Sequence, residues 1–259
     1  MRNLDKYFDI YFGVTPIRCL FLEEIIGLPK DKIRLLPIGS DLEQIQLKVT
    51  KDEFKEKNNL GKETFVITTG GKLTSEKNGD RLIEAFKRLS GDNLRLFIFG
   101  KIIDEKVKKL IKTDDRIVTS EWLNRHDTLA ALKYSDVGIW NTQHTTLMED
   151  AVSVGLPLIL RYYGSTCHLI NDSGVFLYEG SVREIQDKLN FMVKNNEILT
   201  KFRLNSNNHA KMLSYKNIAL ESILYMKDNT PKNIHSTLMG SDFFDYSYPH
   251  LRVLKRSDN

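Results

Sequence analysis

Short apolar runs alternate with amphipathic stretches over residues 64–195. The apolar runs lie at 65–69, 94–100, 116–120, 136–140, 156–160 and 174–178. The stretches between and after them repeat apolar residues at three- and four-residue spacing, at 80–89, 105–112, 125–135, 146–155 and 181–193. Near-continuous apolar strands separated by helices predict a parallel sheet that is covered on both faces. We therefore expect a doubly wound α/β domain whose ligand sits beyond the carboxyl ends of the strands.

The flanking regions follow other patterns. Residues 1–47 predict a short amphipathic helix, a Gly-Leu-Pro stop at 27–29, a short strand and a turn at 37–39. Residues 48–63 are almost wholly polar, which is typical of a linker or a solvated helix. Residues 196–259 predict helices and then an aromatic tail, which we expect to dock on the body of the same molecule. The tail's aromatic residues are Phe243, Phe244, Tyr246 and Tyr248.

Composition narrows the class of protein. A chain of 259 residues, 41% of them hydrophobic, can bury one large core or two small ones. The formal charge of +4 suits an anionic ligand or an acidic membrane surface, but no basic stripe with interleaved aromatics predicts a nucleic-acid partner. Cys19 and Cys167 lack metal-ligand spacing and there is no Asp-x-Asp, so we expect no metal and no cofactor. No apolar run suits a membrane span or a signal peptide, so we expect a cytoplasmic location.

Two short segments suggest a phosphorylated ligand. In "TTGGKLTSEKNGDRLIEAF" (68–86), a glycine pair and Lys72 follow an apolar run, and Lys77 lies at the mouth of a helix. Further on, a polar loop separates a strand from a helix that begins near Thr145 or Thr146. The first backbone N–H groups of such a helix have no partners within the helix and form an anion site at the carboxyl edge of the sheet.

These motifs resemble the C-terminal, donor-binding half of a retaining GT-B glycosyltransferase, the large family related to sucrose and glycogen synthases. "GGKLTSEKNGDRLIEAF" is similar to the family's "G-R/K-L-x-x-E-K-G" followed by "L-I-E-A-F", and "DAVSVGLPLI" (150–159) to its "A-M-A-x-G-x-P-V-I". "GLPKDKIRLLPIGSD" resembles the segment that leads out of the family's N-terminal domain. The resemblance implies the end of an acceptor-side domain at 1–47, a linker at 48–63, a Rossmann-like donor domain at 64–195 and C-terminal helices at 196–259.

The resemblance also implies site residues. Lys72 and Lys77 would hold the diphosphate of a nucleotide-sugar, together with Gly71 and the helix start at Thr145 and Thr146. Asp150 stands in the place of the family's ribose-binding glutamate, with Glu149 as the alternative. The main chain at Ser120, Glu121 and Trp122 would meet the base, and we expect the Trp122 side chain to pack rather than to stack on the base. For His168 we expect a structural role.

One position departs from the family pattern. Thr142 replaces the acid that approaches the transferred sugar, and Gln143 and His144 replace the loop residues beside it. This departure leaves open whether the site turns over. No nucleophile or general base is assigned, so the catalytic residues stay unknown.

The implied function is transfer of a sugar from a UDP- or GDP-linked donor with retention, a hexosyltransferase type of reaction, in the assembly of a bacterial surface polysaccharide or glycolipid. A non-catalytic sugar-nucleotide-binding or scaffolding subunit is the alternative that Thr142 supports. A nucleotide-sugar 2-epimerase shares the fold but is not expected to carry both motifs. Because only the end of the N-terminal half is present, we expect a truncated chain, a split subunit or a remnant.

The resemblance also bears on the acceptor and on protein partners. The acceptor, a glycan or glycolipid, stays undetermined, and peripheral contact with the inner face of the membrane is compatible with it. The two ends of the chain would leave apolar surface, so we expect self-association or pairing with a separate N-terminal-domain subunit. At the N-terminal end this surface would include Phe8, Tyr11 and Phe12.

Overall fold

The computed structural model describes residues 6–40 and 47–240, and its centre is a six-stranded parallel sheet. The strand order is β5-β4-β3-β6-β7-β8. The order reverses between β3 and β6, which pair at Ile67 with Val137 and Thr68 with Gly138. This reversal places a crevice at the carboxyl ends of β3 and β6. The strands are β3 (Phe65–Leu73), β4 (Leu94–Ile102), β5 (Ile117–Ser120), β6 (Val137–Trp140), β7 (Leu158–Arg161) and β8 (Gly174–Leu177).

Helices cover both faces of this sheet, because alternate residues of each strand point to opposite faces. In β4, Leu96 and Ile98 pack in one buried cluster with α3 (Gly79–Lys87), α4 (Glu105–Ile111) and α7 (Val182–Lys194). Phe97 and Phe99 pack in the other, with α5 (Arg125–Tyr134) and α6 (Thr146–Ser153). The doubly wound α/β prediction is confirmed, including all six strands and the five helices between and after them.

Residues 48–63, expected as a linker or a solvated helix, hold α2 (Lys51–Lys57). A capping box between Thr50 and Glu53 starts this helix. Phe54 is buried and meets the Phe97 ring edge-on at 5.7 Å. Lys55 donates from Nζ to the carbonyls of residues 62 and 64 at 2.7 and 2.8 Å. One apolar residue among many charged ones therefore attaches this helix to the sheet.

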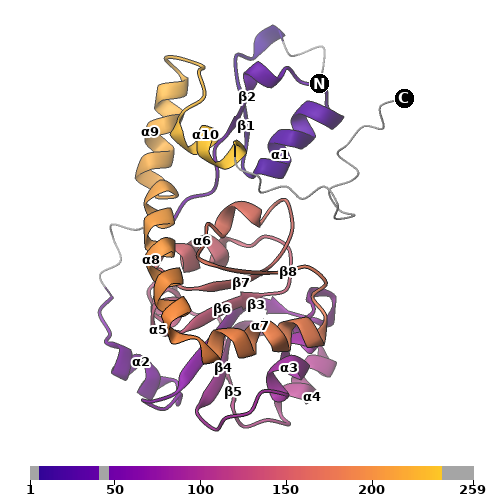
Figure 1. Cartoon of the computed structure of the whole chain (residues 1–259), viewed down its shortest axis with the longest axis vertical. Helices are drawn as coiled ribbons and strands as arrows, with labels where there is room; N and C mark the ends of the chain where they lie inside the picture. The colour runs from indigo at the N-terminus through magenta and orange to yellow at the C-terminus, as the bar shows by residue number, and fades with distance from the viewer. Residues whose placement is uncertain (1–5, 41–46, 241–259) are drawn as a thin grey trace.

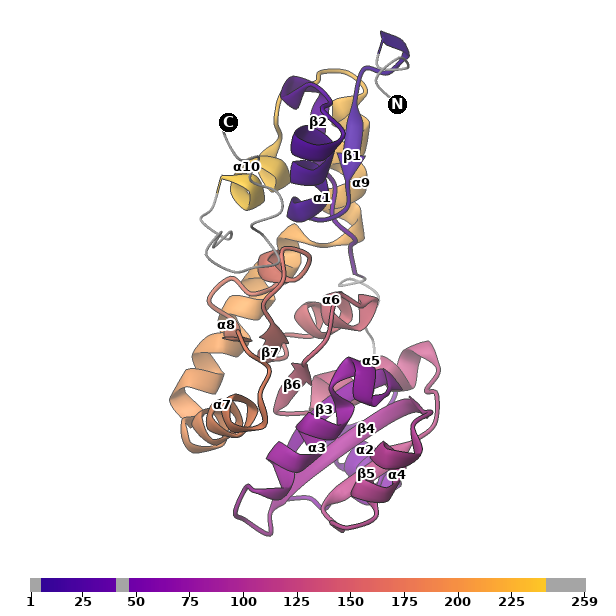
Figure 2. The ribbon, with the colours of Figure 1, turned by 90° about the vertical axis from the view of Figure 1, so that its right-hand side faces the viewer.

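A smaller unit lies above the sheet in Figures 1 and 2 and is built from both ends of the described chain. Its N-terminal part comprises β1 (Tyr11–Gly13), α1 (Pro16–Leu20), the π-helix η2 (Phe21–Ile25), the 3-10 helix η3 (Lys30–Lys32) and β2 (Ile33–Leu35). Its C-terminal part comprises α9 (Tyr215–Tyr225) and α10 (Asn233–Met239), which α8 (Asn196–Met212) connects to the sheet. None of the helices within the described ranges is long and apolar enough to cross a membrane.

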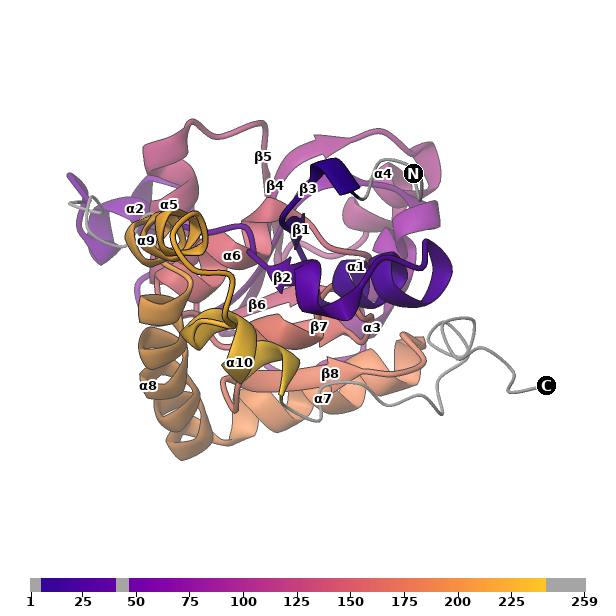
Figure 3. The ribbon, with the colours of Figure 1, turned by 90° about the horizontal axis from the view of Figure 1, so that it is seen from above.

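The two parts of this smaller unit hold each other through specific contacts. Arg34 donates to the carbonyl of Asn229 at 3.0 Å, and the backbone N–H of Leu35 donates to Nδ1 of His235 at 2.8 Å. The Phe12 and Tyr225 rings lie 5.7 Å apart. Seen from above in Figure 3, α9 and α10 lie beside β1, β2 and α1. The C-terminal helices therefore cover the N-terminal segment, while the aromatic tail from Phe243 to Tyr248 lies outside the described residues.

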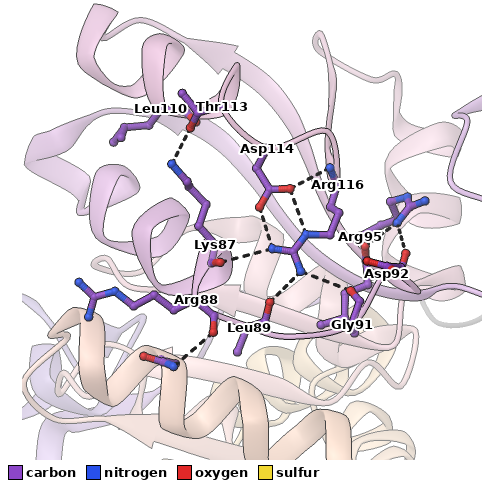
Figure 4. Close-up of polar contacts among 12 residues, drawn as sticks. Lys87, Arg88, Leu89, Gly91, Asp92, Arg95, Leu110, Thr113, Asp114 and Arg116 are labelled. Atoms are coloured by element: carbon purple, nitrogen blue, oxygen red, sulfur yellow. Dashed lines mark hydrogen bonds and ion pairs between the residues drawn. The ribbon is translucent and has the colours of Figure 1, made fainter.

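The amino edge of the sheet, opposite the crevice, is fastened by Arg116 (Figure 4). Its guanidinium forms an ion pair with Asp114 at 2.7 Å and donates to the carbonyl of Leu89 at 2.7 Å. It also lies 5.0 Å from the centre of the Phe86 ring. Hydrogen bonding from Arg116 lowers the pKa of the Asp114 carboxyl. These contacts join the end of α3 to the starts of β4 and β5. They lie at the amino ends of the strands, away from the carboxyl ends where the crevice opens.

Candidate functional site

A cavity of about 410 Å³ opens at the crevice between β3 and β6. One wall comes from the end of β3, the 3-10 helix η4 (Ser75–Lys77) and the start of α3. The other wall comes from the end of β6 and the loop before α6, and one residue comes from the loop after β7. The lining residues are Thr69, Gly70, Gly71, Lys72, Leu73, Glu76, Lys77, Asn78, Gly79, Leu82, Trp140, Asn141, Thr142, Gln143, His144, Thr145 and Tyr163.

Glycines bring the backbone close to this cavity. Gly71 has a φ of +111° and its partner on β4, Gly100, a φ of +115°, a region that disfavours other residues. A Cβ on Gly100 would collide with the carbonyl of Gly71. A Cβ on Gly70 would collide with the ring of Phe99. The glycine pair therefore allows the two strand ends to approach each other beside the pocket.

The two lysines predicted from the sequence both line the cavity and are exposed. Within the described ranges, neither Lys72 nor Lys77 has a hydrogen bond or an ion pair from its Nζ. Lys77 is fixed at its backbone instead, since its N–H donates to Oγ1 of Thr74 at 3.2 Å. Asn78 then adopts a left-handed φ of 58° and donates to the carbonyl of Asn141 at 2.9 Å. This bond joins the two walls of the cavity. Both lysines therefore line a cavity with fixed walls, and neither has a counter-ion among the described residues.

The start of α6 faces the same space. Thr145 is the N-cap with extended backbone angles, but its side chain makes no capping hydrogen bond. The N–H of Met148 donates to the carbonyl of Thr145, and the N–H groups of Thr146 and Leu147 have no acceptor within the described residues. The helix dipole makes this end of the helix electropositive. Thr142, Gln143, His144 and Thr145 all line the cavity, as the sugar-side and phosphate-side predictions require, while Thr146 is exposed and does not.

Glu149 and Asp150, the two ribose candidates, are both buried and point to different partners. Asp150 accepts from Ser40 Oγ at 3.1 Å and forms an ion pair with Arg125. Glu149 pairs instead with Nε2 of His144. Neither carboxylate lines the cavity. The Ser40 and Arg125 contacts come from segments far apart in the sequence, and no local pattern predicts them.

The predicted base-side residues line a neighbouring hollow of about 580 Å³. Ser120, Glu121 and Trp122 share it with Lys101 and Lys108, and the Glu121 carbonyl accepts from the N–H of Gly100. The expectation that Trp122 packs is wrong, because its side chain is 57% exposed. Its neighbours Ser120, Glu121 and Asn124 are polar, which explains why the ring lies on the surface rather than in a core.

His168 is fully buried. Burial, with His144 and His209 nearby, lowers the pKa of its imidazole to about 3, so the ring is neutral. Both ring nitrogens are buried without a hydrogen-bond partner among the described residues, and the structural role expected for His168 stays a prediction. Over the described residues there is no group of three or more His, Cys, Asp or Glu side chains placed to hold a metal ion.

The family model described as "Glycosyl transferases group 1" matches residues 50–209. The chain is 32% identical over 201 residues to UDP-Gal:alpha-D-GlcNAc-diphosphoundecaprenol alpha-1,3-galactosyltransferase of Escherichia coli, a match that covers 67% of this chain and 51% of that protein. A solved glycosyltransferase structure from Rickettsia africae has a TM-score of 0.73 at 15% identity, covering 88% of this chain and 67% of the other. The structure of Anabaena HepE in complex with UDP-glucose has a TM-score of 0.71 at 12% identity, covering 87% and 65%.

At identities of 15% and 12%, the likeness to solved structures shows the fold alone. The chain spans about half the length of the E. coli relative. The family match is the stronger evidence for membership of a family, because it includes all six strands of the sheet and more than half of the chain. The chain therefore belongs to the glycosyl transferases group 1 family.

Proposed function

We propose that this chain is the donor-binding half of a glycosyltransferase that moves a hexose from a UDP-sugar, with retention, during assembly of a bacterial surface polysaccharide or glycolipid. The observation that carries the proposal is the cavity at the β3–β6 crevice, where Lys72 and Lys77 have no counter-ion among the described residues and line the same space as the start of α6. An anionic diphosphate is the ligand that such a cluster of positive groups suits. The choice of UDP rests on the names of the E. coli relative and of the HepE complex.

In this proposal the lysines act on the leaving group. When the bond between sugar and diphosphate breaks, negative charge grows on the phosphate oxygens, and cations fixed nearby stabilise it. The glycine pair at 70–71 allows the backbone to approach the phosphates. Asp150 is the proposed ribose contact: it is buried behind the cavity lining, but each of its oxygens keeps a lone pair beside its contact with Ser40 or Arg125. The main chain at 120–122 serves the base.

The acceptor is proposed from chemistry and from the relative's name. The E. coli protein is named for a sugar attached to diphosphoundecaprenol, a lipid carrier. A lipid-linked acceptor would place the reaction at the inner face of the membrane, where the chain's positive charge helps peripheral contact. Acceptor contacts would come from an N-terminal half supplied by a longer chain, a separate subunit or a second copy. Light scattering over a wide range of concentrations tests self-association, and a monomer at every concentration would exclude the second copy.

Ligand-induced stabilisation tests the donor site directly. UDP should raise the melting temperature of the chain and uridine should do so far less, because the phosphates make most of the contacts. At a hundredfold excess over the dissociation constant, UDP would add about 2.7 kcal/mol to the free energy of unfolding. GDP and guanosine form the parallel pair that tests the base. Equal shifts from nucleotide and nucleoside would refute the phosphate site.

A non-catalytic subunit that binds a sugar nucleotide is the second candidate, and Thr142 is the observation that favours it. A hydroxyl there brings no charge to the transferred sugar. The family match favours transfer over the 2-epimerase alternative. Release of free UDP from UDP-galactose, measured with the chain alone and with an added N-terminal domain, distinguishes turnover from binding without turnover.

A further inference from the structure

A buried histidine–carboxylate pair lies beside the cavity. His144 lines the cavity with a side chain that is 17% exposed, and its Nε2 hydrogen-bonds Oε1 of Glu149, which is 1% exposed. The other carboxylate oxygen, Oε2, is buried and has no hydrogen-bond partner in the part of the chain that the structure describes. No lysine or arginine of the described residues contacts Glu149, so the imidazole is its partner.

Burial makes this pair costly. A carboxylate removed from water is destabilising unless hydrogen bonds and an opposite charge compensate for it. Among the described residues, Glu149 has a single partner for its two oxygens. The ring of His168, whose centre lies 6.4 Å from that of His144, is neutral at ordinary pH and brings no charge to the pair. A methionine or leucine at residue 149 would bury the same space at less cost, so a role in ligand binding explains the pair better than a role in stability.

The pair also fixes the imidazole. The two ring nitrogens of histidine lie on different sides of the ring, and the partner of one decides what the other presents. With Nε2–H held by Glu149, Nδ1 is the nitrogen left for a ligand, and it has no partner among residues 6–40 and 47–240. A hydroxyl can donate to this nitrogen or accept from it, so it can be a partner for Nδ1 whether or not that nitrogen carries a proton.

We propose that Nδ1 of His144, oriented by Glu149, forms a hydrogen bond with a hydroxyl of the transferred sugar. This bond supplies a polar contact to the sugar where Thr142 brings no charge. This inference rests on the proposed function. The phosphates are assigned to Lys72, Lys77 and the start of α6, so His144 is left for the sugar end of the donor. Glu149 becomes a positioning residue rather than a ribose ligand, which leaves the ribose to Asp150.

Calorimetric titration with UDP and with UDP-galactose tests the inference, because both ligands carry the ribose but only the second carries the transferred hexose. His144→Ala should bind UDP within about twofold of the unmodified protein but UDP-galactose about threefold to tenfold more weakly, the loss expected for one hydrogen bond. Glu149→Leu should lower the same preference, because leucine offers Nε2–H no acceptor and the ring loses its orienting partner. In the double variant the two losses should not add, since both act through one contact. Glu197→Gln, an exposed acid in the first turn of α8, is the matched control.

The outcomes separate this inference from the proposed function. Equal weakening of UDP and UDP-galactose would put His144 on the nucleotide and overturn the inference alone. An unchanged preference in both His144→Ala and Glu149→Leu would also overturn it. Failure of the unmodified protein to bind UDP would overturn the proposed function and this inference together. Melting temperatures of the variants identify any that fail to fold, and the remaining variant then decides.

Discussion

The bond between Leu35 and His235 makes the stability of this protein depend on pH. Leu35 donates its backbone N–H to Nδ1 of His235, so that nitrogen must carry no proton. Burial, with the charges of Arg34 and Lys30 nearby, lowers the pKa of His235 from 6.5 to about 4. The neutral ring therefore joins β2 to α10, and protonation breaks this contact.

Proton linkage gives the size of the effect. In the unfolded chain the His235 pKa returns to about 6.5, so between about pH 6.5 and about pH 4 the unfolded state binds more protons. The free energy of unfolding must therefore fall as the pH falls through this window. At about pH 5 the folded ring is still mostly neutral, and a distance of about 1.5 pH units below the unfolded pKa corresponds to about 2 kcal/mol. Any folded pKa well below about 5 gives nearly the same value.

Urea unfolding at about pH 7 and about pH 5, for the unmodified protein and for His235→Asn, measures this term. The asparagine side chain keeps an acceptor oxygen near the position of Nδ1 and does not titrate. Burial also lowers the pKa of His168 and His209, but both are present in the two proteins, so the comparison isolates His235. The unmodified protein should lose about 2 kcal/mol more than the variant. Equal losses, or a His235 ring that titrates near pH 6.5 in the folded protein by NMR, would refute the reasoning.

Three substitutions test other parts of the structure. Lys77→Ala should weaken UDP binding by about 1.5–3 kcal/mol in calorimetry. Lys201→Ala, which removes an exposed lysine of α8, is the control and should leave the affinity unchanged. Unchanged affinity in folded Lys77→Ala would assign Lys77 to the solvated surface. Phe54→Ala should lower the free energy of urea unfolding by about 3–5 kcal/mol because the ring is buried, and a loss below about 1 kcal/mol would show that α2 contributes little. Gly100→Ala should cost more than about 1 kcal/mol, because its φ is +115° and the new Cβ meets the Gly71 carbonyl; an unchanged melting temperature would contradict this strain.

The sheet could be predicted from sequence because each of its strands is a near-continuous apolar run between helical patterns. β1 could not, since it has three residues and its pairing partner Ile33 lies far along the chain from Tyr11. The sequence does not decide between a linker and a helix at 51–57, because a single buried phenylalanine among charged residues gives no apolar period. Short, non-local pairings and single anchor residues depend on tertiary contacts that the local sequence does not carry.

For the candidate site, local motifs located the residues but not their partners. Lys72, Lys77 and the loop at 142–145 line one cavity, as their positions at the ends of β3 and β6 predict; their roles in binding stay predictions. The pairing of His144 with Glu149 could not be predicted, because it depends on how the loop folds back on the first turns of α6. The contact of Ser40 with Asp150 joins residues 110 positions apart, which no local pattern specifies.

The contact between Arg34 and Asn229 has a consequence for synthesis on the ribosome, because 195 positions separate its two residues. A ribosome that adds about 5–20 residues per second takes roughly 10–40 s to cover that distance. During this interval β1, α1 and β2 have left the ribosome, while α9 and α10, which cover them, do not yet exist. Ile33 and Leu35, buried in the finished protein, are exposed to solvent or to a chaperone for that time. The strands of the sheet domain all lie between these two segments, so the sheet domain can fold first. It then holds α9 and α10 in place as they bind β1, α1 and β2.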